Sequence, residues 1–316
     1  MKLKTAGIHH ITAFVYDAQR NVNFYVGVLG LRLIKKTVNF DAPEVYHLYF
    51  GDQIGTPGSV ITFFPFNQGK RGRIGGGQVG SVTFAIPIGA ISFWEDRLKN
   101  YDVTYQVIER FDEMYLCFQD PDGVQLELVE RADGENSEWS VEGISTIHAI
   151  KGLGGAKLYS LSPNKTLGLL QEGLGLERIA EDSNWIRLSS YGALGNIIDL
   201  NRNSIERGMG GLGTVHHIAW RTQDQEEHLR WREKILSLGL QPTDQVDRQY
   251  FLALYFREPG GILFEISTDS PGFTVDEPID QLGRNLKLPL WLEPHRNELE
   301  QLLPPINVRA LEGDQT

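Results

Sequence analysis

Two identical histidine-containing strings lie far apart in this 316-residue chain, His9-His10-Ile11 and His216-His217-Ile218. A third candidate, Glu265, lies in an otherwise apolar segment, where a buried carboxylate needs a cation to offset its desolvation. Two imidazoles and one carboxylate on one face of a metal leave three coordination positions open, which is the facial triad of non-haem Fe(II) oxygen chemistry. An isolated histidine in a strand is more commonly structural, but the repeated string favours His10, His217 and Glu265 as metal ligands.

The composition is that of a globular protein, with 41% hydrophobic and 22% charged residues. Lys plus Arg number 30 and Asp plus Glu 41, so the net charge is −11. An acidic chain without a basic stripe is a poor candidate for binding nucleic acid or an anionic membrane. Because it also lacks a long apolar run, a signal-peptide core and any cysteine besides Cys117, we expect a cytoplasmic protein without disulfides.

The candidate residues lie in a repeated pattern of one strand, one amphipathic helix ending near glycine, and three more strands. The four modules span residues 7–66, 78–131, 145–202 and 213–268. Their first strands are expected at His10–Val15, Val82–Phe84, Thr146–His148 and Val215–Ile218, and the helix of the fourth module is expected at Gln225–Ser237. Residues 67–77 and 132–144 read as linkers.

The modules predict an α+β fold. A βαβββ module cannot cover its own curved sheet, so two must pair and four imply two incomplete β-barrels. Along the sequence the modules divide into a first domain, 7–131, and a second domain, 145–268. The remaining residues, 269–316, are expected to form a C-terminal tail that packs on the second half.

Repeated βαβββ modules with a histidine near the first strand and a glutamate in the last resemble the vicinal oxygen chelate (glyoxalase/bleomycin resistance/dioxygenase) superfamily, over about residues 7–268. Four modules favour its ring-cleaving extradiol dioxygenases, because small members have two. Strings similar to the hydroquinone-cleaving branch are Gly7-Ile8-His9-His10-Ile11-Thr12, Lys36-Thr37-Val38-Asn39-Phe40-Asp41, Gly213-Thr214-Val215-His216-His217-Ile218-Ala219 and Leu288-Pro289-Leu290-Trp291-Leu292-Glu293-Pro294-His295-Arg296.

The resemblance implies that the first and last strands of paired modules face one shared cavity. The equivalent positions are His10, Phe84, Ala149 and His217 on the first strands and Phe63, Glu127, Asp199 and Glu265 on the last. Only modules one and four together supply two histidines and one carboxylate, with Phe63 at the fourth corner. We therefore predict that they pair around Fe(II), with Mn(II) as the alternative metal, and that modules two and three form a barrel without one. Glu127 is interpreted as structural.

The resemblance also assigns active-site positions to Thr12, His216, Arg248 and Tyr255. By residue type alone, His216 could equally be a core histidine, Arg248 a surface cation and Tyr255 a core tyrosine. If the substrate is a para-diol, only one hydroxyl can reach the metal, and His47 is predicted to contact the other.

The predicted function is ring cleavage of a hydroquinone- or catechol-type aromatic diol with O2. One alternative is a glyoxalase-like metal-dependent lyase or isomerase, although such sites usually need a further carboxylate. The other alternative is a binding protein that sequesters an aromatic compound. Exposed barrel edges and the apolar tail also suggest a homodimer.

Overall fold

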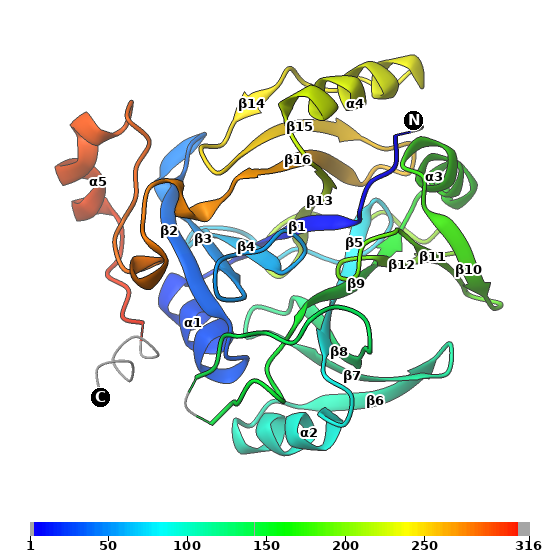
Figure 1. Ribbon diagram of the computed structural model, residues 1–316, viewed down its shortest axis with the longest axis horizontal. Helices are drawn as coiled ribbons and strands as arrows, with labels where there is room; N and C mark the ends of the chain where they lie inside the picture. Colours follow the sequence, from blue (N-terminus) through cyan, green and yellow to red (C-terminus); the bar gives the residue numbers. More distant parts are fainter. Residues whose placement is uncertain (1–2, 142, 309–316) are drawn as a thin grey trace.

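The computed structural model describes residues 3–141 and 143–308 of the chain, and these form two curled eight-stranded sheets (Figure 1). In spatial order, the first sheet contains β14 (Val246–Asp247), β15 (Phe251–Arg257), β16 (Leu263–Pro271), β13 (Val215–Thr222), β1 (Ile8–Val15), β4 (Val60–Pro65), β3 (Ala42–Gly51) and β2 (Arg32–Asn39). The second contains β10 (Glu177–Glu181), β11 (Trp185–Ser189), β12 (Ile197–Asn201), β9 (Gly152–Tyr159), β5 (Gln78–Ile86), β8 (Gln125–Glu130), β7 (Glu113–Gln119) and β6 (Tyr105–Arg110).

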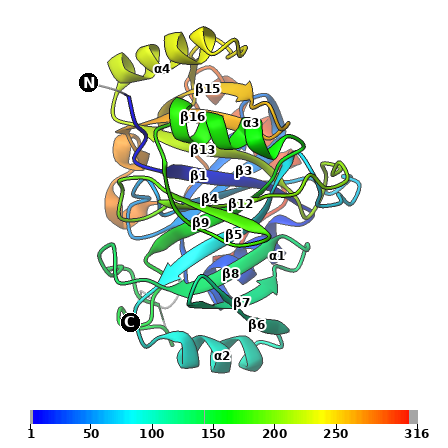
Figure 2. The same ribbon diagram turned by 90° about the vertical axis from the view of Figure 1, so that its right-hand side faces the viewer.

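One helical segment follows the first strand of each module. These segments are α1 (Ala18–Val22) with the π-helical turn η1 (Asn23–Val28), α2 (Ile91–Asn100), α3 (Pro163–Gly168) with η2 (Leu169–Gly173), and α4 (Gln225–Ser237). The side chain of Asp224 accepts a hydrogen bond from the Glu227 amide and caps α4, which has the predicted bounds. Figure 2 shows α4 and α2 at opposite ends of the molecule, with the two sheets between them.

The order of strands confirms that modules one and four share one sheet and modules two and three the other. Strand β1 pairs antiparallel with β13 at the centre of the first sheet, where Thr12 lies opposite His217. Each of the two also pairs in parallel with the last strand of its own module, β4 or β16. In Figure 1, the blue β1 therefore lies beside elements from the last third of the chain. The division into domains 7–131 and 145–268 stays a prediction.

The first strand of the third module was predicted wrongly. Residues 145–149 form a turn in which the Ser145 carbonyl accepts hydrogen bonds from the amides of His148 and Ala149. The strand is the glycine-rich β9, a composition that ordinarily argues against a strand interior. Gly154 allows β5 to approach β9 closely, because a Cβ at this position would lie 3.1 Å from backbone atoms of β5. Ala149 is consequently not equivalent to His217.

The C-terminal tail contains η3 (Phe273–Val275), η4 (Ile279–Gln281), η5 (Glu293–His295) and α5 (Arg296–Leu302). It was expected to pack on the second half, and its described residues contact both halves of the chain. Tyr250, from module four, donates a hydrogen bond to Asp276, but the buried ammonium of Lys35 on β2 also binds Asp276, at 2.6 Å. Tyr46 on β3 donates to the Pro304 carbonyl. The tail thus contacts both modules of the first sheet.

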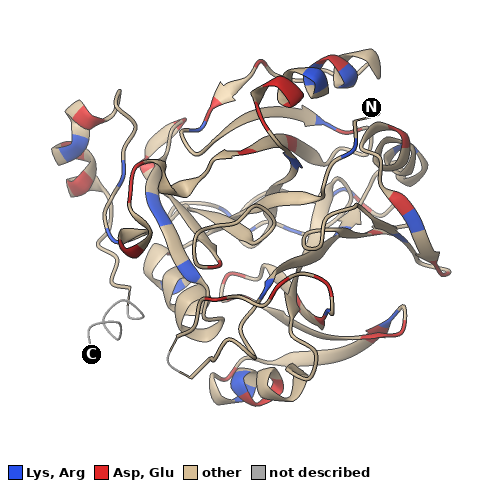
Figure 3. Cartoon of the chain, in the orientation of Figure 1, with Lys and Arg blue, Asp and Glu red and all other residues tan. Residues whose placement is uncertain are grey.

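The described helices include none that is long and apolar enough to span a bilayer. Figure 3 shows basic and acidic residues interspersed on α2, α4 and α5, rather than separated into a basic face.

Candidate metal centre

The structure brings His10, His217 and Glu265 together at the centre of the first sheet. The Nε2 atoms of His10 and His217 are 3.2 Å apart, and Glu265 Oε2 lies 2.8 Å from His217 Nε2 and 3.6 Å from His10 Nε2. All three side chains are buried. Within residues 3–141 and 143–308 they form the one group of three potential ligands close enough to share an ion.

The carboxylate of Glu265 is incompletely satisfied by the protein. Its Oε1 accepts a 2.6 Å hydrogen bond from Ser267, but the fully buried Oε2 accepts none from any described residue, despite lying close to His217. A buried carboxylate oxygen without a donor is unfavourable by about 1–3 kcal/mol or more. A cation placed between this oxygen and the two imidazoles would remove that penalty, so the residues fit a bound metal ion.

Both histidines of the triad are oriented by the histidine that precedes them. The Nδ1 atoms of His9 and His10 share a hydrogen bond of 2.8 Å, and those of His216 and His217 one of 2.9 Å. With Nδ1 engaged in this way, Nε2 of each triad histidine faces the carboxylate. A hydrogen bond at the second ring nitrogen is the usual means of fixing a ligating imidazole.

Burial sets the protonation state of the triad. It lowers the pKa of His10 well below its ordinary value, and together with the charge of Arg248 it lowers the pKa of His217 to about 3. Both imidazoles are therefore neutral at neutral pH, the form that binds metals. Burial also raises the pKa of Glu265, and the opposing effects of His10, Ser267 and Arg248 do not cancel this cost of desolvation.

A cavity of about 190 Å³ adjoins the triad. Its lining residues are His10, Asn39, Phe40, Asp41, His47, Tyr49, Phe64, His216, His217, Arg248, Phe251, Tyr255 and Leu263. The set contains His47, His216, Arg248 and Tyr255 from the predicted site. Thr12 contacts the triad directly, with its Oγ1 2.9 Å from His217 Nε2.

A chain of hydrogen bonds leads from the triad to the cavity wall. Thr12 bonds to Thr62 at 2.8 Å, Thr62 to His47 Nε2 at 2.8 Å, and His47 Nδ1 to the Tyr49 hydroxyl at 2.8 Å. Burial lowers the pKa of His47 well below its ordinary value, so this ring is also neutral. The chain links three strands of module one to a triad residue of module four.

The prediction that Phe63 occupies the fourth corner of the site is wrong. Its ring packs on Tyr25 of η1, with centroids 4.4 Å apart, on the opposite face of the sheet. The neighbouring Thr62 faces the site instead. Because side chains alternate along a strand, an error of one residue exchanges the two faces.

Arg248 and Tyr255 form the cavity wall in module four. The Nε of Arg248 donates to the Tyr255 hydroxyl at 3.1 Å, and its Nη2 donates to Asp41 Oδ2 at 2.9 Å. Burial raises the pKa of Tyr255, so its phenol stays protonated.

Sequence reasoning missed several residues of the site: Asn39, Asp41, Tyr49, Thr62, Phe251 and Ser267. Ser267 could have been found because it lies two positions after Glu265, on the same face of the same strand. Asn39 and Asp41 lie in one of the strings that are similar to the hydroquinone-cleaving branch, but their residue types alone did not identify a role in the site.

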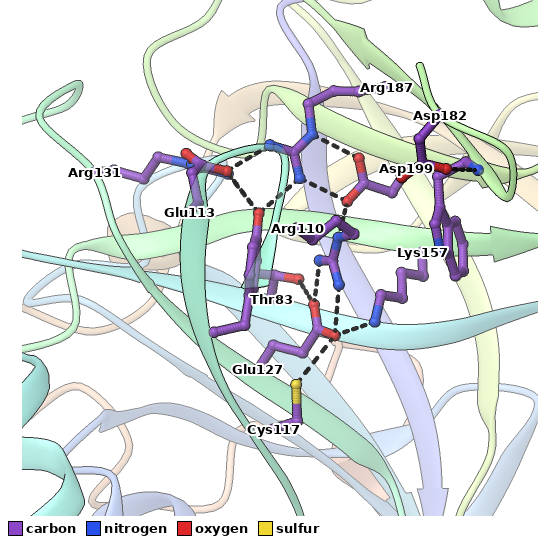
Figure 4. A network of polar contacts seen from close by, with 12 residues as sticks. Thr83, Arg110, Glu113, Cys117, Glu127, Arg131, Lys157, Asp182, Arg187 and Asp199 are labelled. Atoms are coloured by element: carbon purple, nitrogen blue, oxygen red, sulfur yellow. Dashed lines mark hydrogen bonds and ion pairs between the residues drawn. The ribbon is translucent and has the colours of Figure 1, made fainter. Parts of the chain in front are cut away.

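The second sheet carries charged residues where the first carries the triad (Figure 4). Glu127 is bound by Arg110, at 2.8 Å, and by Lys157. Asp199 accepts hydrogen bonds of 2.7 Å from Nε of both Arg110 and Arg187. Arginine and lysine side chains thus neutralise Glu127 and Asp199, the carboxylates of the second sheet that correspond to Glu265. These ion pairs also join module two to module three.

Comparison with known proteins agrees with this arrangement. The family model of the Glyoxalase/Bleomycin resistance protein/Dioxygenase superfamily matches residues 7–128. The provisionally named ring-cleaving dioxygenase MhqO of Bacillus subtilis (strain 168) is 52% identical over 99% of this chain and 100% of its own. The chlorohydroquinone/hydroquinone 1,2-dioxygenase of Sphingobium indicum is 35% identical over 94% of this chain and 95% of its own.

Solved structures give the same result. A crystal structure of a provisionally named dioxygenase from Bacillus subtilis subsp. subtilis str. 168 superposes with a TM-score of 0.97 at 52% identity, covering 98% of this chain and 100% of that one. Glyoxalase I from Zea mays shares the fold, with a TM-score of 0.62 at 15% identity over 84% of this chain and 92% of its own. The chain therefore belongs to the glyoxalase/bleomycin resistance protein/dioxygenase superfamily, in the group whose members are named ring-cleaving dioxygenases.

Proposed function

We propose that this protein is an Fe(II)-dependent dioxygenase that opens the ring of hydroquinone- or catechol-type diols and incorporates both atoms of O2. The observation that carries the proposal is the buried His10–His217–Glu265 triad, which has an unsatisfied carboxylate oxygen and whose two histidines line a cavity large enough for one aromatic ring. The names of the full-length relatives support the same reaction class.

The three side chains would hold the metal through His10 Nε2, His217 Nε2 and Glu265 Oε2. When bound, Fe(II) supplies a Lewis acid that favours the phenolate form of the diol and the redox chemistry needed for O2. One carboxylate offsets only one of its two charges, so the site retains a positive charge that favours an anionic phenolate. Mn(II) fits the same ligand set and is the alternative metal.

The cavity residues would bind and orient the diol and handle its protons. Tyr255 accepts a hydrogen bond from Arg248, which leaves its own hydroxyl proton free to be donated into the cavity. His216 lines the same cavity and is proposed to exchange a proton with the diol. Arg248 is proposed to stabilise developing negative charge on a substrate oxygen. Thr12 lies 2.9 Å from His217 Nε2, and it would release this atom to the metal while keeping its hydrogen bond to Thr62.

The size of the cavity limits the substrate to one ring. An engineered protein cavity of about 150 Å³ accepts benzene, so about 190 Å³ is sufficient for a benzene-diol with a small substituent. We propose that His47 contacts the second hydroxyl of a para-diol. Both of its ring nitrogens are already hydrogen-bonded, so the diol hydroxyl would replace Tyr49 or Thr62 as a partner.

Oxygen consumption provides the test. We expect anaerobically Fe(II)-loaded protein to consume O2 when hydroquinone, methylhydroquinone or catechol is added, with loss of the aromatic ultraviolet spectrum. The matched variant His217→Ala should bind little iron and consume no O2. Substrate conversion without oxygen uptake would instead indicate a lyase or isomerase, and equal iron content in both proteins would exclude the triad as the metal site.

Three further proposals concern the location, the oligomeric state and the partners of the protein. We propose a cytoplasmic homodimer that binds neither nucleic acid nor membranes. Sedimentation velocity measures the oligomeric state, and a monomer at micromolar concentration would contradict the dimer.

A further inference from the structure

Apart from the proposed metal, the charge of the cavity wall depends on a single ion pair. Among the described residues that line the cavity, Arg248 is the one lysine or arginine. Its Nη2 binds Asp41 Oδ2 at 2.9 Å, and this carboxylate also lines the cavity. Asp41 belongs to the β2–β3 turn of module one, whereas Arg248 follows β14 of module four. The ion pair therefore spans the boundary between the two modules.

The position of Asp41 is fixed by its own turn. Its backbone amide donates a 3.0 Å hydrogen bond to the side-chain oxygen of Asn39, which also lines the cavity. The Asp41 side chain is 74% exposed and that of Arg248 is 19% exposed. Asp41 thus lies where the cavity meets solvent, with the guanidinium on its inner side.

This arrangement determines which substituents a bound ring can carry. An unpaired arginine would attract a carboxylate on the substrate through charge-assisted hydrogen bonds. When Arg248 is paired with Asp41, the positive charge of its guanidinium is compensated. A substrate ring that carries a carboxylate would then be repelled by the carboxylate of Asp41. A like-charge contact of this kind disfavours the wrong ligand without improving the binding of the right one.

An uncharged diol does not encounter this repulsion. Two of the three nitrogens of Arg248 are engaged, Nε by Tyr255 and Nη2 by Asp41. The remaining Nη1 can still donate a hydrogen bond to a neutral hydroxyl. The cavity therefore keeps one donor for the diol while presenting no uncompensated arginine charge.

We propose that Asp41 is a specificity-determining residue, which excludes carboxylated dihydroxybenzenes by neutralising Arg248 and so restricts the site to uncharged diols. This inference rests on the proposed function, because it concerns which diols enter the same cavity. The expected effect is about tenfold, since solvent around the exposed Asp41 carboxylate screens its charge.

Two probes of similar shape separate charge from size. 2,5-Dihydroxybenzoate carries a carboxylate, and 2,5-dihydroxybenzamide replaces it with a neutral amide. We expect Asp41→Asn to raise the ratio of kcat/KM for the acid to kcat/KM for the amide about tenfold over the unmodified protein. The increase should shrink as salt is added, and Asp41→Glu, which keeps the charge, should leave the ratio near its original value.

A matched control is available in module four, the module that contains Arg248. Asp244 binds Arg232 at 2.7 Å, with the carboxylate 92% and the arginine 33% exposed, outside the cavity lining. Asp244→Asn removes a similar ion pair and should leave the ratio unchanged. A ratio for Asp41→Asn within twofold of the original at low salt overturns the proposal.

Calorimetric binding of the two probes to Fe(II)-loaded protein without O2 separates this inference from the proposed function. We expect the acid to bind Asp41→Asn about tenfold more tightly than the unmodified protein, with little change for the amide. If no diol is turned over but this shift appears, the proposed reaction fails while the role of Asp41 in selecting ligands holds. If hydroquinone is turned over without the shift, only the role of Asp41 fails.

Discussion

Individual residues of the triad were predictable because the chain repeats itself. Each His-His-Ile string alone is weak evidence for a metal site, but both strings fall on the first strand of a module. The structure places the Nε2 atoms of His10 and His217 3.2 Å apart. Thr62 was not predictable from alternation alone, because its place beside Thr12 is set by the pairing of β4 with β1. Counting from a turn could not show which face of β4 would meet the triad.

The unsatisfied oxygen of Glu265 leads to a prediction at this scale. In Glu265→Gln we expect affinity for Fe(II) to fall by more than about 100-fold, because loss of an outer hydrogen-bond partner alone costs about 10- to 100-fold. The metal-free variant should be at least as stable as the metal-free parent, since a buried carboxylate oxygen without a donor is removed. Iron analysis and urea denaturation of metal-free protein measure the two effects. Unchanged iron content would show that Glu265 is not a ligand.

At the scale of elements, helices were predicted better than strands. The bounds of α4 agree because a capping aspartate precedes an amphipathic segment, and both signals are local. Strand β9 was missed because its glycines are favoured by a tertiary contact, the close approach of β5, which a local pattern does not contain. The failure at Phe63 has the same origin, since strand register depends on the partner strand.

Adjacent residues on β4 provide a test of this register. Thr62→Val removes the hydroxyl between Thr12 and His47, so we expect diol turnover to fall about tenfold with a loss of stability of about 1 kcal/mol. Phe63→Ala opens a cavity beside Tyr25, so we expect it to destabilise the fold by about 3–5 kcal/mol while iron binding to the folded protein is retained. Steady-state oxygen uptake and denaturant titration distinguish the two. The reverse pattern would mean that Phe63 faces the site.

At the scale of the whole molecule, the pairing of modules followed from eliminating combinations that lack two histidines. The content of the second barrel did not follow. Glu127 and Asp199 were visible in the sequence, but their partners Arg110 and Arg187 come from β6 and β11, which only the folded sheet brings together. Although burial opposes its charge, Arg110 and Lys157 hold the pKa of Glu127 below the ordinary value of 4.5.

Acid denaturation should reveal this cluster. Because the folded pKa of Glu127 is depressed, its stabilising contribution is present above pH 4.5 and is lost as the pH falls through the folded pKa. Glu127→Gln should therefore be less stable at pH 7, by about 3 kcal/mol, since it leaves the largely buried Lys157 without a carboxylate partner and Arg110 with Asp199 alone. Its stability should also fall less between pH 5 and pH 3. Chemical denaturation at several pH values measures both, and iron content should equal that of the parent, the opposite of Glu265→Gln.

The central pairing of β1 with β13 has a consequence for biosynthesis. A nascent chain still lacking its fourth module contains His10 but neither of the residues that complete the triad, so it cannot assemble the proposed metal site. Metal uptake at this site would then wait until nearly the whole polypeptide has left the ribosome, and prematurely terminated products would stay metal-free. Loading would thereby be reserved for finished molecules.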